Sequence, residues 1–299
     1  MKHLSHLLFL LLASLFVSCS EDAPQVDLQD VTTPFLPAAD DTSEEAQMRR
    51  AFYQDYGSFL LFNDPLQHRL LGTDVNGDSH YFTEVLDLPY EIGMSTASNT
   101  HYTYTLLADT PSRRIAMQYV RDYLLPHFSG VLMPYSWLLV DQIQRENLGN
   151  ISSPYAAAGQ RAVVVACHLL PQLTDAQRAQ FTAQVINIII GRLVTDNAAA
   201  FTDFLAVSQA YYDGTFTAPS TAAENAALLN AAGFICRGQS YGTDVNGLYP
   251  SPTLDLSAFA RLVVANSEET LQTRYEQYPL VLKKCTLMRQ ILKSLGYVE

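Results

Sequence analysis

The sequence predicts an α+β fold, with a mixed α/β half and a small sheet over residues 42–173 and a helical half over residues 174–299. Between residues 81 and 107, many tyrosines and threonines alternate with other side chains, which is typical of half-buried strands. The run Val185–Ile190 is apolar on nearly every side, as in a helix at the centre of a fold. Beyond it, helix caps and apolar stripes recur up to Gly296.

The composition indicates a large folded chain that does not bind nucleic acid. Of its 299 residues, 48% are hydrophobic, which is enough to bury a full core. The 30 acidic and 18 basic residues give a net charge of −12. A surface of this sign repels phosphate backbones, so nucleic acid is not an expected partner.

Residues 1–18 are predicted to be a lipoprotein signal peptide. Lys2 supplies a basic start, Leu7–Val17 is a short apolar run, and the small Ser18 precedes Cys19. The run is too short to span a bilayer as a helix, which takes roughly 20 residues. Ser18 followed by Cys19 resembles the lipobox of bacterial lipoprotein signal peptidase, which implies a diacylglycerol on the Cys19 thiol. The alternative is an ordinary signal peptide with a chance cysteine.

Residues 19–41 are predicted to be a flexible acidic tether, because they hold three prolines and six acids and lack a helical period. Ser20, Glu21 and Asp22 directly follow Cys19 and resemble the acidic signal that sends Bacteroidota lipoproteins to the cell surface. The alternative is a solvated segment that happens to be acidic. We therefore expect an outer-membrane protein, lipid-anchored through acylated Cys19 and facing the cell exterior.

The α/β half is expected to begin with a helix that runs to about Tyr56. Thr42 and Glu45 have the spacing of a capping box, and Met48, Phe52 and Tyr56 share one face. Strands are predicted at Ser58–Phe62, Tyr81–Tyr90, Thr100–Leu107, Ser136–Val140 and Ala162–Cys167.

A second helix in this half is predicted from Thr110 to about Leu125. Thr110 supplies a cap, and Pro111 occupies the first helical position, where no N–H is needed. The expected core stripe consists of Ala116, Val120, Tyr123 and Leu124.

The helical half is expected to start with a central buried helix up to about Leu193. Thr174 and Gln177 form a capping box, and exposure of the isoleucines that follow would cost roughly 1.5–3 kcal/mol each. The last predicted helix ends at Gly296 and carries an apolar face of Leu287, Ile291 and Leu295. The later helices are predicted at Ala198–Tyr212, Ala222–Ala232, Ser257–Ala265, Glu268–Tyr275 and Leu280–Leu295.

The hexapeptide Gly-Thr-Asp-Val-Asn-Gly occurs twice, at Gly72–Gly77 and Gly242–Gly247. Asn-Gly tolerates positive φ, so both copies predict tight turns. The alternative is calcium binding, since Asp74, Asn76 and Asp78 alternate as in an EF-hand loop. That loop also needs a glycine and a glutamate that are missing here.

The order of these elements matches the layout of zincin-type metallopeptidases. In detail the chain resembles the zinc-binding metallopeptidase lipoproteins of Bacteroidota, which are often encoded beside SusC/SusD-type import genes. The resemblance implies a single zincin-like domain over residues 42–299, with a TonB-dependent transporter and its lid lipoprotein as partners. It is carried by Tyr53–Gly57 with Ser58–Phe62, Tyr119–Phe128 with Ser136–Asp141, the central helix after Leu173-Thr174, and Asp255–Gly296.

The zinc motif of that family is absent. Members with intact sites carry H-E-x-x-H on the central helix, because residues i and i+4 share a face and bind one zinc. Asn187–Gly191 stands at that place, so no metal ligand, cofactor or catalytic residue is expected. The histidines after the signal peptide are never four residues apart. His168 follows Cys167, but adjacent strand residues point to opposite faces, so a shared metal is not expected.

The cysteines after Cys19 are Cys167, Cys236 and Cys285, and each lies among apolar neighbours without C-x-x-C spacing. We expect buried free thiols, although one disulfide with a leftover thiol stays an alternative.

Tyr211 and Tyr212, which precede Asp213-Gly214, are a candidate ligand platform, because tyrosine rings stack on sugars or peptides and their hydroxyls form hydrogen bonds. The alternative is that both pack in the core. No G-x-S-x-G elbow, P-loop or G-x-G-x-x-G fingerprint is present.

Together these features predict a non-catalytic surface lipoprotein, an accessory subunit of a SusCD-like TonB-dependent complex that imports peptides or glycans, on a degenerate metallopeptidase scaffold. A divergent zinc metallopeptidase or another surface hydrolase is the alternative. A structural envelope protein without a ligand is the third possibility.

Overall fold

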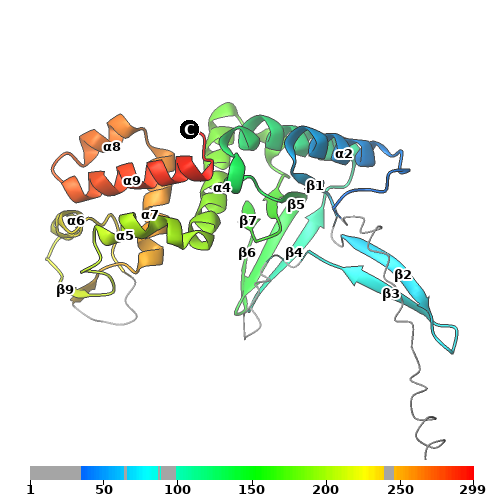
Figure 1. Ribbon diagram of the computed structural model, residues 1–299, viewed down its shortest axis with the longest axis horizontal. Helices are drawn as coiled ribbons and strands as arrows, with labels where there is room; N and C mark the ends of the chain where they lie inside the picture. The colour runs from blue at the N-terminus through cyan, green and yellow to red at the C-terminus, as the bar shows by residue number, and fades with distance from the viewer. Residues whose placement is uncertain (1–34, 64–65, 87, 89–98, 239–245) are drawn as a thin grey trace, which may run out of the picture. The chain divides into compact units, whose positions relative to one another are not determined.

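The computed structural model describes residues 35–299 apart from 64–65, 87, 89–98 and 239–245, and these residues belong to one compact unit, Pro34–Glu299. It is an α+β fold, as predicted: a mixed sheet is followed by a largely helical part (Figure 1). The predicted lipidation and export residues Cys19, Ser20, Glu21 and Asp22 lie outside the described residues. Phe35, within the predicted tether, is buried.

A six-stranded sheet is organised around the long strand β5 (Ser136–Asn147). The first residues of β5 pair in parallel with β1 (Phe59–Leu61) and β8 (Val163–Ala166), whereas its later residues pair antiparallel with β4 and β6. The remaining strands of this sheet are β4 (Thr100–Leu106), β6 (Asn150–Ser152) and β7 (Ala156–Ala158), the last antiparallel to β8.

Both faces of this sheet are covered near β1, β5 and β8. Trp137 and Leu139 belong to the main core, while Leu138 and Val140 belong to a second core on the opposite face. Successive strand residues point to opposite faces, so burial on both sides requires a continuous apolar run. The strands predicted at Ser58–Phe62, Ser136–Val140 and Ala162–Cys167 are therefore confirmed.

The cap of the first helix, α2 (Glu44–Tyr56), lies one residue later than predicted. Ser43, and not Thr42, is the N-cap, and its Oγ accepts a hydrogen bond from Ala46 N at 3.2 Å. Glu45 is engaged with arginine side chains instead of closing a capping box. The predicted buried face is confirmed, with Phe52 fully inside the core.

The second helix, α3 (Thr110–Tyr119), is capped by Asp109 and not by the predicted Thr110, because Asp109 Oδ1 accepts from Ser112 N at 2.8 Å. It continues as a π-helical turn, Val120–Leu124, and a 3₁₀ turn, Leu125–His127. The π turn breaks the 3.6-residue period, so Tyr123 is 41% exposed, contrary to the predicted stripe. The other three stripe residues, Ala116, Val120 and Leu124, are buried as predicted.

The central helix α4 (Asp175–Asp196) is capped as predicted: Gln177 N donates to Thr174 Oγ1 at 3.4 Å, and Thr174 N donates to Gln177 Oε1 at 3.0 Å. No residue from Phe181 to Arg192 is exposed. In Figure 1 α4 lies between the sheet and the later helices, so the predicted central buried helix is confirmed.

The later helices confirm some predicted bounds and correct others. The predicted helix Ala198–Tyr212 is wrong beyond Ala206, because Val207–Tyr212 forms turns. A hydrogen bond from Ser208 Oγ to Ala232 O, at 2.8 Å, holds these turns in place. Helix α7 starts earlier than predicted, since Ser251 caps it. These helices are α5 (Thr202–Ala206), α6 (Ala222–Ala231), α7 (Pro252–Ala265), α8 (Glu268–Arg274) and α9 (Pro279–Leu295), with 3₁₀ turns at Gly130–Leu132, Leu170–Gln172 and Ala198–Phe201.

Helix α9 buries a different face from the one predicted. The expected residues Leu287, Ile291 and Leu295 are only half-buried, at the flank of the core. The buried face includes a charged residue, which the apolar pattern alone excluded; it consists of Val281, Lys284, Cys285, Met288 and Leu292. Gly296 ends the helix with φ 113°, as predicted. None of the helices in the described ranges is long and apolar enough to cross a membrane.

The two identical hexapeptides adopt different structures. In the first copy Asp74 Oδ1 accepts from Asn76 N and Asp78 N at 2.8 and 2.9 Å, which forms the predicted turn between β2 (Gln67–Thr73) and β3 (Ser79–Glu84).

In the second copy the predicted Asn246-Gly247 turn is wrong, because both residues lie in β10 (Asn246–Leu248), which pairs antiparallel with β9 (Thr215–Thr217). A Cβ on Gly247 would lie 2.1 Å from the ring of Phe216, so glycine serves close packing there. The rest of this copy lies outside the described residues.

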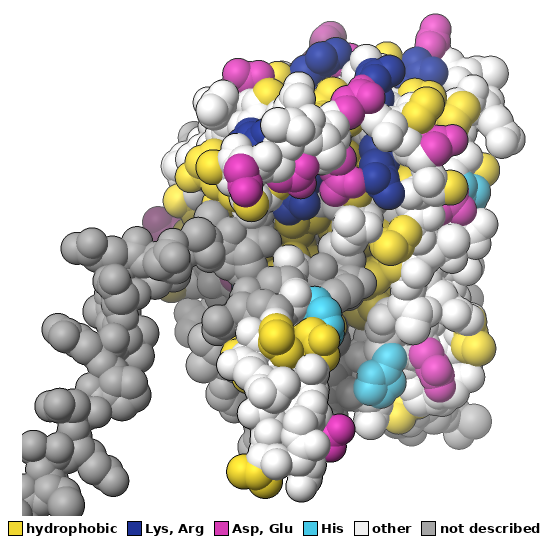
Figure 2. All heavy atoms as spheres, turned by 90° about the vertical axis from the view of Figure 1, so that its right-hand side faces the viewer, with side chains coloured by type: hydrophobic (Ala, Val, Ile, Leu, Met, Phe, Trp, Pro, Cys, Tyr) yellow, Lys and Arg dark blue, Asp and Glu magenta, His cyan; other side chains and the backbone are white. Residues whose placement is uncertain are grey.

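The β2–β3 hairpin carries several exposed hydrophobic side chains. Leu70 is 55% exposed and Tyr81 is 53% exposed, and Figure 2 shows hydrophobic side chains on this hairpin. The ring of His68 stacks on Tyr81 at 4.6 Å. A two-stranded hairpin gains little stability by itself. The ion pair between Glu84 and Arg161 at 2.8 Å joins its base to the loop between β7 and β8.

Candidate functional site

The two tyrosines of the predicted platform lie between α5 and β9 and face different surroundings. Tyr211 is 41% exposed, and its ring packs against Tyr249 and Phe234 with centroids 5.2 and 6.4 Å away. Tyr212 turns inward, where its Oη donates to Asp255 Oδ2 at 2.7 Å. Of the two rings, Tyr211 is therefore the one that a ligand could reach.

A tight turn after Tyr212 holds the exposed ring in place. Asp213 has a φ of 57°, a conformation that aspartate tolerates better than most residues. Gly214 N donates to Tyr211 O at 3.0 Å, and Tyr249 N donates to Gly214 O at 2.9 Å. These bonds fix Tyr211 beside Tyr249.

A cavity of about 480 Å³ is lined by Tyr249, whereas neither Tyr211 nor Tyr212 lines it. It is within the size range of small-ligand sites. Tyr249 contributes a half-buried ring for stacking, while hydroxyl and charged groups contribute hydrogen-bond donors and acceptors. These polar groups come from Asp213, Ser251, Thr253, Ser257 and Arg261. A ring beside several hydroxyl-binding groups suits a sugar or a short peptide.

Beneath the platform lies a fully buried ion pair between α7 and α9. Lys284 Nζ is 2.6 Å from Asp255 Oδ2, and both side chains are 0% exposed. Asp255 Oδ1 has no hydrogen-bond partner among the described residues. The Lys284 ammonium also lies over four aromatic rings, a geometry that stabilises a buried cation. They are Phe204, Tyr212, Phe234 and Phe259, with centroids 4.8, 5.4, 4.4 and 5.3 Å away.

Burial dominates the electrostatics of this pair. It raises the pKa of Asp255 and lowers the pKa of Lys284, although the partner's charge opposes each shift. Burial also raises the pKa of Tyr212, and the charge of Asp255 adds to it. Because Lys284 and Asp255 are sealed from solvent, they do not meet a ligand. They position Tyr212, and through it the turn that carries Tyr211.

Sequence reasoning missed Asp255, Lys284 and Tyr249. Lys284 falls three residues after Val281 and four before Met288, so helical spacing alone could have placed it on the buried face. No local signal marks Asp255 as its partner.

The place of the zinc motif on α4 offers no zinc ligands. Asn187 is half-buried, its Oδ1 lacks a partner in the described part of the chain, and Gly191 has no side chain. Within the described residues, no three His, Cys, Asp or Glu side chains are grouped so that they could hold a metal ion. These residues do not fit the zinc site that the family resemblance implies.

The side chains of the neighbours Cys167 and His168 have different surroundings, so they do not form a pair of metal ligands. Cys167 is buried, and His168 Nδ1 lies 3.0 Å from Asp141 O. All three described cysteines are free thiols, as predicted, but Cys236 is only half-buried. Burial raises the pKa of both Cys236 and Cys285 to about 11, which keeps these thiols protonated at neutral pH.

No protein-family model matches the chain, and no curated protein or solved structure matches it either.

Proposed function

We propose that the protein is a non-catalytic ligand-binding lipoprotein of the outer membrane, an accessory subunit of a SusCD-like TonB-dependent complex that imports peptides or glycans. The observation that carries the proposal is the cavity lined by Tyr249, whose ring packs against Tyr211. Its chemistry suits binding, because it combines stacking rings with hydroxyl and charged groups.

The proposed scaffold is zincin-like, with acylated Cys19 as its anchor in the outer leaflet. The order of mixed sheet, central helix α4 and helical half supports this scaffold. Asn187 and Gly191 at the motif positions support a role without zinc catalysis. The proposed partners are the transporter and its lid lipoprotein.

Ligand binding is tested by thermal stabilisation with peptide and glycan libraries, because a ligand of the folded state raises apparent stability. Tyr249→Ala removes the ring that lines the cavity, and Tyr102→Ala is the control, since both tyrosines are half-buried but only Tyr249 lines the cavity. We expect Tyr249→Ala to weaken binding of the best ligand at least about tenfold and Tyr102→Ala to leave it unchanged. Equal binding by both variants, or no stabilising ligand, would contradict the proposed site.

Two further measurements test the other parts of the proposal. Elemental analysis of the purified protein should find no stoichiometric zinc; one zinc per chain would restore the metallopeptidase alternative. Gentle detergent extraction should recover the protein with a TonB-dependent transporter, and migration alone would count against the accessory role. Cys19→Ser should abolish incorporation of labelled fatty acid.

A further inference from the structure

A second cavity, of about 590 Å³, shares no lining residue with the first. Its walls come from the first half of α4, the segment Val120–His127, Val264 and Tyr297. Four stretches that are distant in the sequence therefore converge on it.

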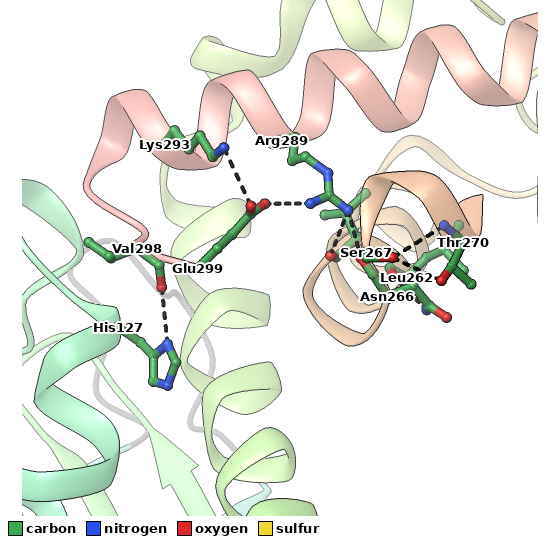
Figure 3. Close-up of polar contacts among 10 residues, drawn as sticks. His127, Leu262, Asn266, Ser267, Thr270, Arg289, Lys293, Val298 and Glu299 are labelled. Carbon is green, nitrogen blue, oxygen red and sulfur yellow. Dashed lines mark hydrogen bonds and ion pairs between the residues drawn. The ribbon is translucent and has the colours of Figure 1, made fainter. Parts of the chain in front are cut away.

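The wall around Tyr297 is held rigidly. His127 Nδ1 is 3.0 Å from Val298 O, and the rings of His127 and Tyr297 stack with centroids 6.2 Å apart. Glu299, two residues after Tyr297, is also held, and Figure 3 shows its carboxylate between Arg289 and Lys293. A wall fixed before binding loses little entropy when a ligand arrives.

The opposite wall is equally fixed. The Arg178 guanidinium lies over the ring of Tyr123 at 5.3 Å and donates to its hydroxyl at 3.2 Å. Arg178 also donates to Asp175 Oδ1 at 3.1 Å and to Leu173 O at 3.2 Å. These bonds occupy both terminal nitrogens of Arg178, so its charge is already matched.

Two hydrogen-bond acceptors of this cavity are open to a ligand. A carbonyl oxygen can only accept, so His127 Nδ1 donates to Val298 O, and in the neutral imidazole the other nitrogen, Nε2, is an acceptor. Figure 3 shows this second nitrogen pointing away from Val298. Asp175 is bound through Oδ1, and its Oδ2 makes no hydrogen bond to a described residue. Its side chain is fully exposed, so an incoming cation can reach it.

We infer that this cavity binds an apolar amine: a flat or branched hydrophobic group that carries a protonated amino group. Ala179, Ala183 and Ile186 supply apolar contact, flanked by two tyrosine rings. Asp175 and the His127 lone pair would accept from the amine. An anionic ligand of the same shape would meet carboxylates and an arginine that is already engaged.

The test uses phenethylamine and 3-phenylpropionate, which share a phenyl group and differ in the sign of their charge at pH 7. Binding is followed by NMR titration of the full chain. Ala179→Phe fills the cavity, and Ala176→Phe is the control, because both alanines are exposed on α4 but only Ala179 lines the cavity. Asp175→Asn removes the open carboxylate.

Phenethylamine should bind wild type and Ala176→Phe with equal affinity, and Ala179→Phe at least about tenfold more weakly. It should bind wild type more tightly than 3-phenylpropionate does, and Asp175→Asn should narrow that difference. Unchanged binding to Ala179→Phe, no saturable binding to wild type, or tighter binding of 3-phenylpropionate would overturn the inference. Tyr249→Ala, which alters the first cavity, should not alter this binding, so the outcome is independent of the proposed function.

Discussion

Ion pairs in the two halves of the fold have different surroundings. In the helical half, Lys284 and Asp255 are both 0% exposed. In the α/β half, Glu45 joins α2 to Arg113 of α3, with side chains 19% and 20% exposed. Next to it, Glu44 pairs with Arg114, with side chains about half exposed. The contacts are chemically alike, and their access to water decreases from the exposed pair to the buried one.

Because of this difference, the stability lost on removing one partner should depend on how well water reaches the charge that remains. A charge that is left alone in water is rehydrated, whereas a charge left alone in a core is not. The same burial makes a complete buried pair a weak source of stability, because desolvation opposes the attraction. The three pairs therefore form a graded series within one protein.

The largest effect is expected for Asp255→Ala. It leaves the Lys284 ammonium buried without its counter-charge, which should lower the free energy of unfolding by about 3–5 kcal/mol. Chemical denaturation followed by circular dichroism measures it. A change below about 1 kcal/mol would show that the ammonium finds water or another partner.

The control removes both charges at once. Asp255→Leu combined with Lys284→Met should recover most of the loss, since hydrophobic replacement of a complete buried pair is often neutral or stabilising. If the double variant is as unstable as the single one, packing and not charge determines the effect.

The pH dependence of this pair follows from the directions of its pKa shifts. Burial raises the pKa of Asp255, so its contribution to stability is present below the ordinary value of 3.8 and lost as pH rises through the raised folded value. Burial lowers the pKa of Lys284, so its contribution is present above 10.5 and lost as pH falls through the lowered folded value. The pair should therefore contribute least near neutral pH.

The measurement is the unfolding free energy of wild type minus that of the Asp255→Leu/Lys284→Met variant across pH, which cancels the other carboxylates. The difference should be smallest near neutrality and increase toward acid and alkali. A decrease on acidification would mean that the attraction between the charges exceeds their desolvation.

A smaller effect is expected for Glu45→Gln. Glu45 accepts from Arg113 and lies 3.6 Å from Arg49, whose Nε also donates to Leu60 O at 2.9 Å. Loss of the Glu45 charge from this half-buried group should lower the free energy of unfolding by about 1–2 kcal/mol. Arg49 keeps its backbone bond, so a loss as large as that of Asp255→Ala would place Glu45 in a less hydrated setting than its exposure indicates.

Features that depend on neighbouring residues could be predicted from the sequence, whereas features that depend on distant partners could not. The central strands, the cap at Thr174 and the burial of α4 depend on neighbouring residues, and they are confirmed. The turn predicted for the second copy of the hexapeptide is wrong, because Asn246 and Gly247 pair as a strand with β9 from elsewhere in the chain.

The candidate site shows the same limit. Tyr211 and Tyr212 are recognisable from composition, but the partners of Tyr212, Asp255 and Lys284, lie 43 and 72 residues away. A lysine on a helix is expected to face water. Only the tertiary packing of four rings and a carboxylate explains why Lys284 does not.

The smallest effect is expected for Glu44→Gln, which differs from Glu45→Gln by one position and by access to water. Glu44 is 56% exposed and pairs with an exposed Arg114, so Glu44→Gln should lower the free energy of unfolding by about 0.5 kcal/mol. Its place in the first turn of α2 adds a small favourable interaction with the helix dipole. Because both contributions are screened by salt, the difference between Glu44→Gln and wild type should vanish near 1 M NaCl. The Glu45→Gln difference should persist there, since its arginines are half-buried, and equal salt sensitivity of the two variants would contradict the graded series.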